Sequence, residues 1–204
     1  MSQAEILVPK MTLDEFLAWE ETQEERHEYL DGVVRAMSGG SLDHNQIVAN
    51  ITKVTGVQLE NTPCRSLTSS QRVQSESVRS YFYPDVLIVC EEPKLGKGDS
   101  ILNPLVIFEV LSPSTEKYDR YEKFRRYQTI KTLQEYFLIR QDTAIVEAFR
   151  RMDGKTWTTT AYNVYVGLDT LLTVESAGIS FPLRAIYDRV VLEDAEPQKE
   201  EGEI

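Results

Sequence analysis

Two acidic residues that interrupt strongly apolar runs constrain this chain more than any other feature of its sequence. Asp85 lies in residues 83–89, YPDVLIV, and Glu109 lies in residues 105–111, LVIFEVL. Such runs are typical of strands that are buried on both faces of a sheet. A carboxylate in that setting is costly unless it is paired, protonated or bound to a cation. The two residues therefore predict neighbouring strands that share one site for a hard metal ion.

The order of the predicted elements indicates a mixed α/β (α+β) fold, with a central mixed sheet flanked by helices. Residues 12–15, TLDE, fit a capping box that begins a short helix. Further helices are expected at about 43–60 and 114–130. Asp31-Gly32 and Asp153-Gly154 predict hairpin turns. Strands are expected at 27–30, 33–37, 65–69, 71–75, 84–90, 105–111, 135–139, 144–150, 157–162, 171–174 and 181–187.

The length of 204 residues favours a single domain, which we expect to span residues 1–192. The net charge of −11 is concentrated at the two ends, because residues 1–28 carry −6 and residues 193–204 carry −5. The remaining body is neutral, and its segment 117–131 carries +4. An acidic chain is therefore still compatible with a nucleic-acid partner, and the 193–204 tail is expected to be disordered.

The sequence shows no signal peptide and no apolar run of the roughly 18–20 residues that a membrane helix needs. Cys64 and Cys90 are too few for a disulfide framework, and Cys90 ends a predicted buried strand. We therefore expect reduced cysteines and a cytoplasmic protein without a membrane partner.

Lys123 lies on the apolar face of the helix predicted at 114–130, together with Phe124, Tyr127 and Ile130. An inward-pointing lysine near two carboxylates could stabilise charge on a phosphate. A lysine that extends to solvent and pairs with Asp119 explains the same spacing equally well. By spacing alone, Glu28 and His44 (the latter near a helix start) are most simply solvated or capping residues.

Four segments together resemble the Uma-type restriction endonuclease family, which belongs to the PD-(D/E)XK nuclease superfamily. They are Pro84-Asp85, the run EVLSPST at 109–115, the series Asp119, Lys123 and Tyr127, and Glu135-Tyr136. The hairpin at 28–32 and His44 also match the family pattern. The resemblance covers about residues 12–190 and implies a restriction-endonuclease-like fold. The superfamily motif places lysine two residues after the glutamate, where this chain has Leu111.

The resemblance implies a catalytic set of Glu28, Asp85, Glu109 and Lys123. Asp85 and Glu109 would bind Mg²⁺, with Mn²⁺ as a substitute, and Lys123 would replace the missing motif lysine. His44, Ser112 and Tyr127 are possible accessory residues. The implied activity is Mg²⁺-dependent hydrolysis of DNA, and a homodimer would suit the cutting of two strands.

Two alternatives remain open at the level of sequence. The first is a catalytically silent protein of the same fold that binds nucleic acid or a protein. The second is a hydrolase that uses Ser112 or Ser114. It is disfavoured because the chain has no Gly-x-Ser-x-Gly motif. The SPST run at 112–115 is better explained as a helix-capping turn whose backbone amides could face a phosphate.

Overall fold

Two sheets meet in this protein, and the candidate site lies where they join. The computed structural model describes residues 10–37, 39–152 and 156–193, with the backbone alone at 158–161. The larger sheet is mixed and has the order β10-β9-β8-β7-β6-β3, in which only β7 and β8 are parallel. Its strands are β3 (Cys64–Thr68), β6 (Val86–Cys90), β7 (Val106–Leu111), β8 (Glu135–Arg140), β9 (Ile145–Met152) and β10 (Thr156–Val166).

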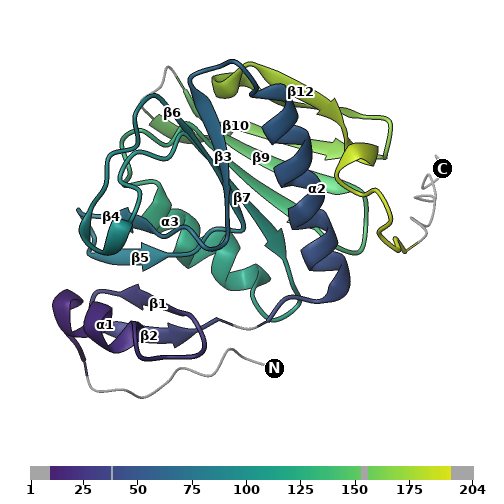
Figure 1. Ribbon diagram of the computed structural model, residues 1–204. Coiled ribbons are helices and arrows are strands. Elements are labelled where there is room, and N and C mark those ends of the chain that lie inside the picture. The colour runs from purple at the N-terminus through teal and green to yellow at the C-terminus, as the bar shows by residue number, and fades with distance from the viewer. Residues whose placement is uncertain (1–9, 38, 153–155, 194–204) are drawn as a thin grey trace, which may run out of the picture.

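The smaller sheet is antiparallel and carries the N-terminal hairpin. Its order is β2-β1-β5-β4, with β1 (His27–Leu30), β2 (Val33–Ala36), β4 (Val73–Ser75) and β5 (Ser80–Phe82). Helix α1 (Leu13–Glu20) packs Phe16 against Tyr29 of β1. Figure 1 shows this hairpin and α1 as a separate layer at one end of the large sheet. A third pair, β11 (Leu171–Val174) with β12 (Ile179–Pro182), lies beyond α2.

Helices cover both faces of the large sheet, as the sequence predicts. Helix α2 (Leu42–Gln58) packs Ile47 and Ile51 on the face that carries Phe108. The segment formed by η2 (Tyr118–Lys123) and α3 (Phe124–Tyr127) packs Phe124 and Tyr127 on the opposite face. Figure 1 shows α2 crossing the sheet on the viewer's side and α3 behind it. Side chains alternate along β7, so Phe108 packs in the apolar core beneath α2 and Ile107 packs in the apolar core beneath η2 and α3.

Most expected elements are present, and the differences have local causes. The capping box of Thr12 and Glu15 and the turn at Asp31-Gly32 are confirmed. The helix predicted at 114–130 is helical only over 116–127, and its middle is the π-helix η2. Strand β6 begins at Val86, so Asp85 precedes the strand, and β5 was not predicted. The strand expected at 181–187 ends at Pro182, where the 3₁₀ turn η4 (Leu183–Ala185) begins.

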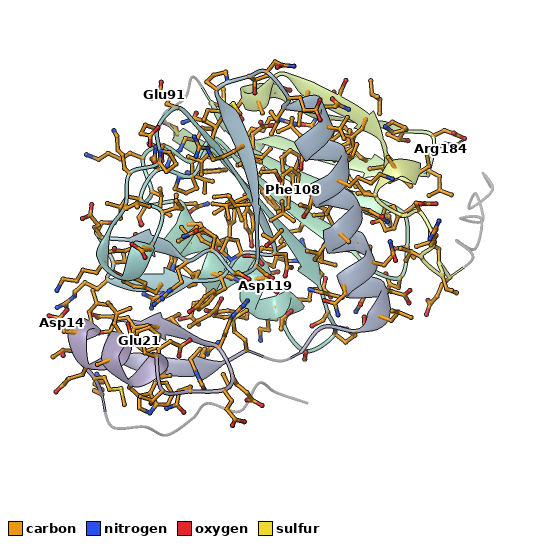
Figure 2. The ribbon with its side chains drawn as sticks, in the orientation of Figure 1. Asp14, Glu21, Glu91, Phe108, Asp119 and Arg184 are labelled. Carbon is orange, nitrogen blue, oxygen red and sulfur yellow. A yellow bond between two sulfur atoms is a disulfide. The ribbon has the colours of Figure 1, made fainter. Side chains whose placement is uncertain are left out.

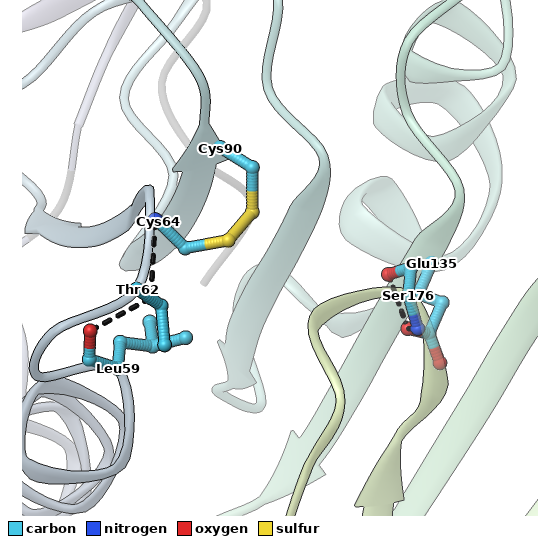
Figure 3. Close-up of a disulfide and its surroundings, with 6 residues drawn as sticks. All are labelled: Leu59, Thr62, Cys64, Cys90, Glu135 and Ser176. Atoms are coloured by element: carbon cyan, nitrogen blue, oxygen red, sulfur yellow. Dashed lines mark hydrogen bonds between the residues drawn. A yellow bond between two sulfur atoms is a disulfide. The ribbon is translucent and has the colours of Figure 1, made fainter.

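The prediction of reduced cysteines is wrong in this structure. Cys64 and Cys90 form a disulfide that joins β3 to β6 (Figure 3). The pairing register explains it, because the two residues lie directly opposite each other on adjacent antiparallel strands. Cys90 ends β6, whereas Asp85 immediately precedes the other end of that strand. The disulfide therefore lies away from the candidate site.

Three expectations fall partly or wholly on residues outside the described ranges. The turn at Asp153-Gly154 lies there, although β9 and β10 pair on either side of it. The predicted disordered tail also lies there apart from Glu193, and so do the first nine residues of the expected 1–192 domain. Among the described helices, none has the length and apolar character needed to cross a membrane.

Candidate active site

The predicted catalytic residues converge on one pocket of about 250 Å³ at the junction of the two sheets. Glu28 comes from β1, Glu109 from β7 and Lys123 from η2, and Asp85 lies just before β6. Strands β6 and β7 are neighbours, with Val86 opposite Phe108. Continuing that antiparallel register by one residue places Asp85 opposite Glu109. The expectation that the two acids belong to neighbouring strands is therefore confirmed, with Asp85 directly before its strand.

Lys123 lies at the centre of this group and is only 4% exposed. Its Nζ is 2.9 Å from Oε1 of Glu109 and 3.0 Å from Oε1 of Glu28. A third carboxylate, that of Asp119, lies 3.6 Å away on the preceding turn. Lys123 therefore points inward, and it also pairs with Asp119. The inward orientation predicted for Lys123 is therefore confirmed. The alternative interpretation was right about the pair with Asp119 and wrong about extension to solvent.

The position of Glu28 depends on buried polar contacts that hold the N-terminal hairpin. The carboxylate of Glu20, at the end of α1, accepts the backbone N–H of His27 at 2.8 Å and contacts its ring Nδ1 at 3.0 Å. Tyr83, from the segment before Asp85, donates its hydroxyl to the same carboxylate at 3.2 Å. Because Glu28 follows His27 in β1, these contacts fix Glu28 opposite Lys123.

Asp85 is held by one backbone and one side-chain contact. Its Oδ2 accepts the N–H of Val110 at 2.7 Å, and its Oδ1 lies 3.1 Å from Nε2 of His44. His44 lies in the first turn of α2, where Ser41 caps the helix by accepting the N–H of His44. A Cβ atom on Gly40 would lie 2.6 Å from Cδ2 of the His44 ring. Residue 40 must therefore lack a side chain if the ring is to reach Asp85.

Three tyrosines complete the hydrogen bonding around the acids. The hydroxyl of Tyr127 donates to Oε1 of Glu109 at 3.0 Å, and that of Tyr118 donates to Oε2 of Glu28 at 2.7 Å. The hydroxyl of Tyr136 donates to the backbone carbonyl of Asp119 at 3.0 Å. Burial raises the pKa of each of these hydroxyls well above its usual value, so they act as donors. Tyr127 thus contacts Glu109 from the same helical face that carries Lys123.

The carboxyl groups of Glu28, Asp85, Glu109 and Asp119 line the same pocket as the single ammonium of Lys123. Burial raises the pKa of Glu109 well above its usual value, and the charges of Asp85 and Asp119 add to the effect against the opposing effect of Lys123. Burial likewise raises the pKa of Asp119 to about 6. Burial alone would lower the pKa of Lys123, but the surrounding carboxylates raise it well above its usual value. The ammonium therefore stays charged, and the site favours an additional cation.

The side chains that line the pocket fit a magnesium ion. Asp85 and Glu109 supply carboxylate oxygens, which Mg²⁺ prefers, and Mg²⁺ often takes only one or two protein carboxylates. Oε1 of Glu28 is buried without a hydrogen-bond partner, although Lys123 lies close to it. Within the described residues, no group of three or more His, Cys, Asp or Glu side chains is placed to hold a metal ion, so Asp85 and Glu109 would be the protein ligands. That arrangement suits an ion that keeps waters and a substrate phosphate as its remaining ligands.

Ser112 lies at the rim of the pocket, where β7 passes into the helical segment. Its hydroxyl accepts the N–H of Thr115 at 3.2 Å and contacts the hydroxyl oxygen of Ser114 at 3.0 Å. This is the capping turn that the sequence predicts, and neither serine pairs with a histidine among the described residues. The pattern explains the SPST run without a serine nucleophile.

Sequence reasoning missed two contributors to the pocket. The helical spacing indicates Asp119 only as a surface partner of Lys123, yet Asp119 is buried and lines the pocket. Its position four residues before an inward-pointing lysine was the available signal. The contact between Tyr118 and Glu28 joins elements that are distant in the sequence, and no local pattern indicates it.

The fold, a large mixed sheet with helices on both faces, has a counterpart of known structure. A crystal structure described as a putative nuclease belonging to DUF820 from Anabaena variabilis matches with a TM-score of 0.70 and 18% sequence identity. The match covers 87% of this chain and 97% of that one. The fold class is thus the expected restriction-endonuclease-like one.

Sequence comparison identifies the family directly. The model of the Uma2 family, described as "Putative restriction endonuclease", matches residues 13–183. The uncharacterized protein slr1290 of Synechocystis sp. is 34% identical over 179 residues, which cover 88% of this chain and 92% of that protein. The uncharacterized protein sll1609 of the same organism is 34% identical over 149 residues, which cover 72% of this chain and 84% of that protein. The chain belongs to the Uma2 family, which places it coarsely among the nucleases and confirms the resemblance.

Proposed function

We propose that this protein is a metal-dependent endonuclease that hydrolyses phosphodiester bonds in DNA. The observation that carries the proposal is the position of the Lys123 amine, 2.9 Å from Glu109 and beside the acid pair that Asp85 completes. A lysine on the neighbouring helix thus reaches the glutamate of the motif, although Leu111 occupies the usual lysine position. The displaced lysine supports an intact site.

In the proposed reaction, Asp85 and Glu109 would hold Mg²⁺, or Mn²⁺ in its place, and the ion would supply Lewis-acid activation of a phosphoryl oxygen. Lys123 stabilises negative charge on the phosphate and orients the attacking water through its N–H groups. Glu28 fixes the lysine through its ion pair. His44 holds Asp85 in position.

Cleavage of supercoiled plasmid and of linear duplex DNA tests the proposal. Wild-type protein is expected to cut with millimolar Mg²⁺ or Mn²⁺ and to stop cutting in EDTA. The variants Asp85→Ala and Glu109→Ala are expected to lose cleavage while thermal unfolding shows that they remain folded. Normal cleavage by both variants would show that the assignment is wrong.

The same experiment separates the enzyme from a catalytically silent member of the fold. If the protein binds DNA but does not cleave it, and if millimolar Mg²⁺ and Mn²⁺ leave its thermal midpoint unchanged, the binding-module alternative is correct. A homodimer is part of the proposal for double-strand cleavage. Sedimentation equilibrium with and without DNA tests it.

A further inference from the structure

We propose that a second pocket, which we call the aromatic pocket, binds one unstacked nucleobase of a strand whose phosphate lies in the candidate active site. This inference rests on the proposed function. The aromatic pocket has a volume of about 420 Å³ and lies between η2–α3 and the strands β9 and β10. That volume lies in the range of ordinary small-ligand sites.

Aromatic rings form most of the walls of this pocket. Phe124 meets Trp157 edge-on, with ring centroids 5.2 Å apart, and contacts Phe149 at 4.8 Å. Tyr162 packs against Phe149 at 4.9 Å. Tyr121 lies at the rim and is 65% exposed, which is unusual for a large aromatic side chain. Such rings stack on the face of any base, so they favour unpaired nucleotides without strong sequence preference.

Polar side chains also line the aromatic pocket, among them Gln128, Arg120 and Glu147. Arg120 and Glu147 form a two-point ion pair at the pocket wall, with both N–O distances 2.6 Å. Because this pair is already satisfied, it leaves no unpaired charge facing the ligand.

The aromatic pocket adjoins the candidate active site through a shared helical segment and a smaller hollow. Within η2, Lys123 lines the active site, whereas Arg120 and Tyr121 line the aromatic pocket. The hollow shares Ser112 with the active site and includes Glu116, whose carboxylate pairs at 3.1 Å with Arg120 of the aromatic pocket. A strand that leaves the active site along this hollow would bring an adjacent base to the aromatic rings.

A base inside a duplex cannot enter such a pocket, because its faces are covered by its neighbours. The occupant must therefore be unpaired already or rotated out of the helix. The inference deepens the proposed function, because it assigns a preference for single-stranded or locally opened DNA to residues outside the acid cluster.

Binding without cleavage provides the test. The affinity of the protein for a labelled single-stranded oligonucleotide is measured in EDTA by fluorescence anisotropy. It is compared with the affinity for a strand of the same length that carries sugars and phosphates without bases. The wild type is expected to bind the base-containing strand roughly ten-fold more tightly, within the range that stacking of one base contributes. Tyr121→Ala and Trp157→Ala are expected to lose most of this difference.

Two comparisons guard against misfolding and nonspecific effects. Tyr121 is so exposed that its truncation should leave the fold intact, so it decides the outcome if Trp157→Ala unfolds. Leu171→Ala removes an apolar side chain that is 56% exposed and lies outside the aromatic pocket, and it should keep the full preference. Equal affinity of the wild type for both strands, or an unchanged preference in Tyr121→Ala, would overturn the inference.

The outcome is distinguishable from failure of the proposed function. If cleavage is absent but the preference for bases disappears in Tyr121→Ala, the aromatic pocket is a nucleobase site on a noncatalytic protein. If cleavage is present and the preference is absent from the start, only the inference about the aromatic pocket fails.

Discussion

The ammonium of Lys123 compensates the negative charge of several carboxylates in the candidate site. Its ammonium lies within 3.6 Å of the carboxylates of Glu28, Glu109 and Asp119. A buried ion pair is weak evidence for stability, but removal of one partner leaves an uncompensated charge. The free energy of unfolding should therefore depend strongly on this residue.

Replacement of Lys123 by Met is expected to lower the free energy of unfolding by about 3–5 kcal/mol near neutral pH. The loss should depend on pH. A buried carboxylate whose pKa is raised by folding contributes stability below its unfolded pKa and loses it as pH rises through its folded pKa. The pKa of Asp119 is already raised to about 6. Urea unfolding should therefore show a larger deficit at pH 8 than at pH 5.

Lys117 offers a matched control for this measurement, because it lies in the same helical segment and is exposed. Lys117→Met should change stability by less than about 0.5 kcal/mol at either pH. A deficit in Lys123→Met that is the same at both pH values would contradict the described electrostatics.

Gly40 tests the coupling between His44 and Asp85. Burial alone would lower the pKa of His44, but the hydrogen bond to Asp85 and the charges of Asp85 and Asp119 raise it above its usual value. In Gly40→Ala the new Cβ should displace the ring, so the pKa of His44 should fall. Titration of the His44 ring signals by NMR, in EDTA, measures this.

Gly39→Ala is the natural control, because a Cβ atom at that position would meet nothing within 4 Å beyond its own chain neighbours. It should leave the His44 titration unchanged. A pKa that falls equally in both variants would show that loop flexibility, and not ring contact, governs the histidine.

Single residues of the candidate site can be predicted from the chain itself only where the signal is local. Asp85 and Glu109 stand out because a carboxylate interrupts an apolar run. Glu28 does not, since its burial depends on Lys123 and Tyr118, which belong to a distant element. Only the family resemblance indicated it.

The helices and strands whose ends are marked by capping or turn residues were the most predictable. The capping box at Thr12 and the turn at Asp31-Gly32 placed α1 and the first hairpin closely. Strand β5 has only three residues, and its pairing with β1 is a tertiary contact. The π-helical turn of η2 was also unpredictable, because the same residues support an α-helix.

The disulfide between β3 and β6 is expected to stabilise the protein. It closes a segment with a sequence separation of 26, and a crosslink of that size typically stabilises a protein by about 3 kcal/mol. The double variant Cys64→Ser, Cys90→Ser should lose about that free energy of unfolding. Because Cys90 and Asp85 flank opposite ends of β6, DNA cleavage below the melting temperature should be unchanged.

Chemical denaturation of the oxidised protein, the reduced protein and the double variant measures this effect. The reduced wild type and the variant should unfold at the same denaturant concentration. Loss of cleavage in the folded variant would show that the disulfide influences the acid pair, contrary to this account.

Acidic residues are concentrated at the two ends of the chain, whereas the basic segment 117–131 lies in its middle. Residues 194–204 hold five acids against Lys199, whereas the body between residues 29 and 192 is neutral. An acidic tail repels DNA at low ionic strength, and salt screens that repulsion. The charge distribution could be read from sequence, whereas the pairing of the two sheets around the site could not.

Deletion of residues 194–204 is expected to tighten duplex binding several-fold at low salt, because four net negative charges are removed. The difference from the full chain should shrink as the salt concentration rises. Anisotropy titrations across a salt series measure both effects. A difference that persists unchanged at high salt would indicate a specific role of the tail instead of charge repulsion.

Asp85 and Glu109 form an acid pair at the junction between the two sheets. Figure 2 shows Asp119 at the same junction, between the N-terminal layer and the large sheet. Crystals soaked in Mn²⁺ test metal binding by this pair through the anomalous signal of the ion. We expect a peak within about 2.2 Å of a carboxylate oxygen of both Asp85 and Glu109, next to the Lys123 amine. A peak that contacts neither carboxylate, or no peak at millimolar Mn²⁺, would contradict this expectation.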